Sequence, residues 1–80
     1  MAKVTLRLFA GAREIAGNAA ITYEANTVQE LLTQAQDDLD GEFARILSIS
    51  RVWLNGEPVE GDSEISDGDE VAVLPPVSGG

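Results

Sequence analysis

The first residues of the chain alternate between apolar and polar positions, which predicts a half-buried β-strand over residues 3–9. The apolar face of this strand is made of Val4, Leu6 and Leu8. A short, weak helix or turn is expected over residues 10–16, followed by a second strand over residues 20–25. The length and spacing of the second strand suit antiparallel pairing with the first.

After Asn26 an apolar residue recurs every three or four positions, which predicts the main helix of the chain. Thr27 and Glu30 have the spacing of a capping box, which satisfies two free amides of the first turn. Asp40-Gly41 is expected to stop the helix, because glycine suits the left-handed position that follows a helix. Apolar residues between 43 and 47 predict a further helical turn that covers one end of the core.

The second half of the chain predicts short strands separated by turns. Residues 51–54 form one strand, and Asn55-Gly56 is a strong hairpin signal because both residues tolerate positive φ. Residues 57–59 return as a short strand, which Pro58 confines to a sheet edge because proline has no backbone N–H. The remaining features are an acidic loop over residues 60–69, anchored by Ile65, and a final strand over residues 70–74.

This order of elements predicts an α+β fold, the ubiquitin-like β-grasp. Its mixed sheet of four to five strands is covered by one main helix, with short helical turns besides. The first and last strands are the most apolar and are expected to form the central pair, set parallel by a right-handed crossover through the helix. The domain is expected to span residues 1–74, followed by a flexible tail over residues 75–80.

Composition removes most catalytic chemistry from the side chains. A chain of 80 residues is expected to form one domain, and it contains neither cysteine nor histidine, so thiolate, zinc-thiolate and imidazole chemistry are absent. No apolar run is long enough for a membrane span or a signal peptide, so a cytoplasmic location is expected.

The chain is strongly acidic, with 14 acidic residues against five basic ones and a net charge of −9. Nucleic acid and anionic membrane surfaces are therefore not expected as partners, because phosphates require lysine and arginine. The charge suits steering toward a basic partner, and it equally suits a solvated surface without a specific purpose.

The carboxylates between residues 60 and 70 raise calcium binding as an alternative function. Calcium loops place ligands at alternate positions, often with a glycine at the bend and a later bidentate glutamate. Residues 62–70 lack that register, and Ile65 is expected to point inward. A solvated loop is the favoured interpretation.

Three large apolar residues are candidates for a partner interface. Phe9 and Trp53 are out of phase with the inward faces of their strands, and exposed aromatic residues often anchor interfaces. Phe9 and Leu74 are assigned to an interface, because adjacent central strands would place them beside the root of the tail. For Trp53 we favour packing against the turn at residues 43–47, while an interface role stays open.

The sequence ends in Pro75-Pro76-Val77-Ser78-Gly79-Gly80, which predicts a thin arm with a bare carboxylate. Pro75 and Pro76 stiffen its root and lower the entropy lost on docking. Gly79 and Gly80 carry no side chains, so they would pass through a channel in which any Cβ would clash. A terminal Gly-Gly is a weak signal alone and a strong one on a β-grasp body.

The chain resembles the MoaD-type sulfur carriers, the small subunit of molybdopterin synthase. The resemblance covers nearly the whole chain and is carried by residues 4–10, Arg13-Glu14, Gly17, residues 52–56 and residues 67–80. Pro-Pro-Val-Ser-Gly-Gly is its most specific part, since related carriers for thiamine, cysteine and tRNA thiolation usually lack the two prolines.

The resemblance implies a non-catalytic, sulfur-donating subunit. Gly80 would be adenylated by a ubiquitin-activating-like adenylyltransferase/sulfurtransferase, which uses ATP, and converted to a thiocarboxylate. The tail would then donate sulfur to a cyclic pyranopterin phosphate in the large synthase subunit, within a 2:2 heterotetramer. It implies no bound cofactor, no metal, no nucleic acid and no membrane. A sister sulfur carrier, a ubiquitin-like protein modifier and a plain β-grasp interaction domain stay open as alternatives.

Overall fold

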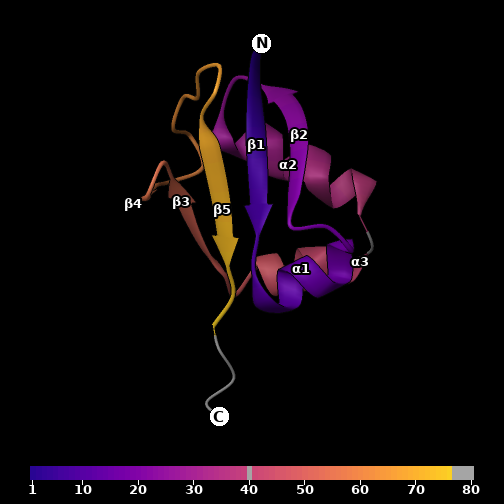
Figure 1. Cartoon of the computed structure of the whole chain (residues 1–80). Coiled ribbons are helices and arrows are strands. Elements are labelled where there is room, and N and C mark those ends of the chain that lie inside the picture. The colour runs from indigo at the N-terminus through magenta and orange to yellow at the C-terminus, as the bar shows by residue number, and fades with distance from the viewer. Residues whose placement is uncertain (40, 77–80) are drawn as a thin grey trace.

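The computed structural model describes residues 1–39 and 41–76 and shows one sheet with helices packed on one face (Figure 1). The elements in chain order are β1 (Ala2–Leu8), α1 (Ala10–Ala16), β2 (Ala20–Ala25), α2 (Val28–Asp38), α3 (Gly41–Leu47), β3 (Arg51–Leu54), β4 (Glu57–Pro58) and β5 (Glu70–Leu74). Within the described residues no helix is long and apolar enough to cross a membrane.

The two ends of the domain meet at the centre of the sheet. The strand order is β2-β1-β5-β3-β4, with β1 and β5 parallel and the other neighbours antiparallel. The predicted β-grasp arrangement and the predicted central pair are therefore confirmed. Because the pair is parallel, β1 and β5 end at the same end of the sheet, beside α1 and α3 (Figure 1).

The core lies between the sheet and the helices. Its fully buried side chains come from the alternating positions of β1 and β5, from one stripe of α2 and from α3: Val4, Leu6, Leu8, Val28, Leu31, Phe43, Val71 and Val73. Ile65 is 7% exposed and anchors the long loop against this cluster, as predicted. Every buried residue of the described chain is apolar.

Helix α2 begins as predicted but ends earlier. The Thr27 side chain accepts a hydrogen bond from the Glu30 amide at 3.2 Å, while the Glu30 carboxylate accepts from the Asn26 amide at 3.0 Å. The predicted stop at Gly41 is wrong, because α2 already ends at Asp38, its C-cap Leu39 has extended backbone, and Gly41 begins α3. Asp40 lies outside the described residues.

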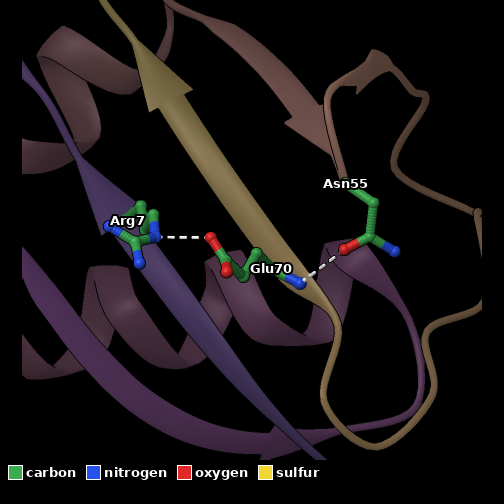
Figure 2. A network of polar contacts seen from close by, with 3 residues as sticks. All are labelled: Arg7, Asn55 and Glu70. Atoms are coloured by element: carbon green, nitrogen blue, oxygen red, sulfur yellow. Dashed lines mark hydrogen bonds and ion pairs between the residues drawn. The ribbon is translucent and has the colours of Figure 1, made fainter.

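The β3–β4 hairpin is tied to the start of β5. Asn55 and Gly56 have φ of 50° and 87°, which confirms the predicted turn. The Asn55 side chain accepts a hydrogen bond from the Glu70 amide at 2.9 Å and donates to the Asp69 carboxylate at 3.0 Å. On the other side of β5, the Glu70 carboxylate forms an ion pair with Arg7 of β1 (Figure 2). This chain of contacts joins the three central strands.

The acidic loop before β5 is fastened to the start of β1. Asp67 accepts a hydrogen bond from the Lys3 amide at 2.7 Å, and the Gly68 amide donates to the Lys3 carbonyl at 2.9 Å. Asp69 accepts from the Ser66 amide at 2.8 Å. Two of the carboxylates weighed as calcium ligands thus hold the turn together, and the described residues contain no cluster of three or more that could hold a metal ion.

The outer edge of β2 is partly covered by α2. The Gln34 side-chain amide donates to the Glu24 carbonyl at 2.6 Å, and the Tyr23 hydroxyl donates to Asp38 at 3.1 Å. Burial, the hydrogen bond and the nearby charge together raise the pKa of Tyr23 to about 12.

We predict that acid weakens the fold partly through Asp69. The hydrogen bonds from Asn55 and Ser66 hold the pKa of this carboxyl below its usual range, so its contribution is present above the unfolded pKa and is lost as pH falls through the folded value. The free energy of unfolding in urea, measured between pH 2 and 6, should fall less steeply with decreasing pH for Asp69→Asn than for wild type. Asp62→Asn, on the same exposed loop, is the control, and equal slopes for both variants would contradict the prediction.

We predict that the stability of the fold falls as pH rises through the alkaline range, partly because of Tyr23. Its pKa is raised, so the stabilisation is present below about pH 10, the ordinary value, and is lost as pH rises toward about 12. Phenolate absorbance should therefore titrate near 12 in wild type. Asp38→Asn should lower the midpoint without restoring the ordinary value, because burial is the largest cause. Asp37→Asn is the control: it removes one neighbouring negative charge but leaves the hydrogen bond between Tyr23 and Asp38 in place. It should shift the titration midpoint of Tyr23 less than Asp38→Asn does.

Candidate functional site: the root of the tail

The tail leaves the folded body from the middle of the sheet. Strand β5 ends at Leu74, between the end of β1 and the start of β3, and Pro75 and Pro76 follow directly. Pro75 is half-buried and Pro76 is exposed. Neither proline has an amide to donate, so the ladder cannot continue past Leu74. The predicted site residues Val77, Ser78, Gly79 and Gly80 lie outside the described residues.

The predicted neighbours of the tail root lie side by side. Leu8 pairs with Val73, so Phe9 and Leu74, one position further along, lie at the same end of the two central strands. Phe9 is 43% exposed and Leu74 is half-buried, and both fall on the solvent face of the sheet because Leu8 and Val73 point into the core.

The position of Phe9 is set by the helix that it precedes. Its extended backbone forms the N-cap of α1, and its carbonyl accepts hydrogen bonds from the amides of Ala12 and Arg13 at 3.1 and 3.3 Å. Because the Phe9 backbone is still extended and Leu8 points into the core, alternation directs the Phe9 ring away from the core. Its role in an interface stays a prediction.

Trp53 lies on the solvent face of the sheet, not against residues 43–47 as favoured from the sequence. Its neighbours Val52 and Leu54 pack against the core, so alternation directs Trp53 to the opposite face from the buried Phe43. In register, Trp53 pairs with Ala72 of β5 on one side and with Pro58 of β4 on the other. The indole is half-buried on this face.

Two further residues of this face, Ala72 and Arg51, were not assigned from the sequence. Ala72 pairs with both Trp53 and Arg7, and Leu74 pairs with Arg51. The alternation of β5 could have indicated that Ala72 and Leu74 share the outer face, but only the register brings them next to these partners. We define the tail-root face as Phe9, Arg51, Trp53, Ala72 and Leu74.

A surface hollow lies elsewhere, along β2 and α2. Lys3 of β1, Tyr23 of β2 and Gln34 of α2 are among its lining residues, and none of them belongs to the tail-root face. The tail-root face itself offers an apolar platform with arginine beside it, which suits binding of a protein rather than turnover of a small molecule.

Several solved structures are similar to this chain over nearly its whole length. The structure of SAMP1 from Haloferax volcanii is 27% identical, with a TM-score of 0.87, and the match covers 98% of this chain and 99% of that one. A putative molybdopterin converting factor, subunit 1, from Pyrococcus furiosus is 27% identical, with a TM-score of 0.85 and coverage of 96% and 100%. A search of the curated proteins found no match.

A third structure contains a partner protein. It is a complex of subunits 1 and 2 of the molybdopterin-converting factor from Helicobacter pylori, 25% identical to this chain, with a TM-score of 0.75 and coverage of 98% and 99%. At the level of sequence families, residues 6–80 match the ThiS family, and this match includes the closing glycines. The chain therefore belongs to the ThiS family of ubiquitin-like proteins.

Proposed function

We propose that this protein is a sulfur carrier of molybdenum cofactor biosynthesis, whose reactive group is the carboxylate of Gly80. The observation that carries the proposal is the position of the tail: Pro75-Pro76 and Gly79-Gly80 follow the central strand β5 of a ThiS-family fold. The body presents the tail, and the chain contains no cysteine that could act as a thiol nucleophile.

The chemistry requires activation, because a carboxylate is a poor acyl donor. In the proposed reaction the Gly80 carboxylate attacks the α-phosphate of ATP on an activating enzyme, giving an acyl-adenylate and pyrophosphate. A sulfur nucleophile supplied through that enzyme then displaces AMP, and the product is a thiocarboxylate. The thiocarboxylate sulfur then forms a bond to a cyclic pyranopterin phosphate in the large synthase subunit. Water hydrolyses the acyl–sulfur bond, which leaves the sulfur on the pterin and returns the tail to a carboxylate. All of these steps belong to the cytoplasm and need no cofactor on this chain.

The tail-root face supports docking to such partners. Phe9, Trp53 and Leu74 are apolar and accessible within one face, and aromatic residues contribute strongly to the centre of interfaces. Subunit 1 of the Helicobacter pylori factor is in complex with subunit 2, so a structural neighbour of this chain binds a partner protein. We propose the corresponding large subunit, in a 2:2 assembly, as the acceptor partner here.

A second function is favoured by a specific observation. The SAMP1 structure matches over 98% of the chain, and a small archaeal modifier protein 1 from Methanosarcina acetivorans matches with 29% identity. Conjugation to lysine would use the same adenylated Gly80, with an amine in place of sulfur. The two functions therefore share the tail and differ in the nucleophile.

We predict that the purified chain, incubated with its activating enzyme, ATP and a sulfur source, gains the mass of one oxygen-to-sulfur exchange. Deletion of Gly80, or addition of one residue after it, should abolish the gain and change the free energy of unfolding by less than about 1 kcal/mol, because the tail follows the last strand. The measurements are intact mass and thermal unfolding. An unchanged wild-type mass contradicts the carrier function, and an isopeptide ladder in cell extract indicates the modifier instead.

We predict that Phe9→Ala weakens binding of the large synthase subunit about tenfold and costs less than about 1 kcal/mol of stability, because the ring is outside the core. Ile49→Ala is the matched control, since Ile49 is another exposed apolar residue and lies outside the sheet. Calorimetric titration and urea unfolding separate the two effects. A loss of stability without a loss of affinity would assign Phe9 to the fold.

A further inference from the structure

The charge of the chain is unevenly distributed between the two ends of the molecule. Residues 57–70 contain seven acidic residues and no basic one. The basic residues other than Lys3 are Arg7, Arg13, Arg45 and Arg51. Glu14 and Glu42 are the acidic residues of the two short helices that carry Arg13 and Arg45. The net charge of −9 is therefore not spread evenly, since all the arginines lie outside residues 57–70.

The fold gathers these arginines at the end from which the tail emerges. Helices α1 and α3 lie at the end of the sheet where β1 and β5 finish, and β3 begins there (Figure 1). Arg7 is the last residue but one of β1, and Arg51 opens β3 opposite Leu74. The acidic loop lies at the other end, where its turn is bonded to the start of β1 through Lys3.

The arginines nearest the tail root are accessible. Arg13 and Arg51 are exposed, and within residues 1–39 and 41–76 neither forms an ion pair with a carboxylate. Arg7 differs, because it is paired with Glu70. Arg51 lies directly beside the apolar part of the tail-root face, so a partner that covers Leu74 also covers the guanidinium.

We propose that the activating enzyme binds the tail-root face through an apolar surface that is bordered by a rim of carboxylates. In this complex the acidic loop of the carrier would lie at the end of the domain away from the enzyme. The proposal rests on the proposed function and specifies the contact surface of the activating enzyme. It replaces the expectation, drawn from net charge, that a basic surface surrounds the carrier. Complementary charge acts mainly on the rate and orientation of encounter, and a phosphate-binding group deeper in the partner is compatible with an acidic rim.

Two substitutions that change the net charge equally distinguish an effect of where the charge lies from an effect of net charge alone. Arg51→Glu and Lys3→Glu both change the net charge from −9 to −11, but they act at opposite ends of the molecule. Association with the purified activating enzyme that charges wild-type Gly80 is measured by stopped-flow fluorescence at low and high salt. Arg51→Glu is expected to lower the association rate constant about tenfold and Lys3→Glu by less than about twofold, with a smaller difference at high salt.

Thermal unfolding and conversion to the thiocarboxylate are measured on the same protein samples. Both side chains are exposed, so the thermal unfolding of both variants should stay close to that of wild type. Lys3→Glu should be converted to the thiocarboxylate mass at the wild-type rate, and Arg51→Glu should be converted more slowly. Equal effects of the two variants, or faster association of Arg51→Glu, would overturn the carboxylate rim and leave the sulfur-carrier function standing. A wild-type chain that no activating enzyme charges would overturn both proposals.

Discussion

The parallel pairing of β1 with β5 is the constraint on which the rest of the structure depends. It places the two most apolar strands in the centre of the sheet, where Leu6 and Val71 meet in register and are fully buried. Because both strands run in the same direction, the last strand finishes beside Phe9 rather than beside the N-terminus. The turn at residues 66–69 is held by the same pair, through the bond of the Thr5 amide to the Asp69 carbonyl at 3.0 Å.

The architecture could be predicted from the sequence because the local patterns of this chain and its overall fold favour the same elements. Alternation predicted β1, the Asn55-Gly56 turn predicted the hairpin, and Pro58 predicted an edge strand, which β4 is. Gly41 was misassigned because glycine also occurs as the first residue of a helix. The two helical segments were predicted, but nothing in the local pattern indicated that α2 already ends at Asp38 or that Gly41 begins α3.

The candidate site was predictable only in part, because it depends on register. The adjacency of Phe9 and Leu74 followed from placing the first and last strands together. Trp53 was expected to be covered, as large aromatic residues usually are, but a sheet with helices on one face leaves its other face to solvent. Composition likewise contains no information about where Arg51 and the acidic loop lie relative to the tail, and only the fold places them.

The direction of β5 has a mechanical consequence for any force applied to the chain after Leu74. A pull on the residues after Leu74 acts along the axis of β5, which is bonded to β1 on one side and to β3 on the other. Such a force loads the hydrogen bonds of both ladders together in shear, whereas a force across an edge strand would open bonds one after another. The fold therefore resists a force applied to the chain after Leu74 better than it would if the last strand lay at a sheet edge.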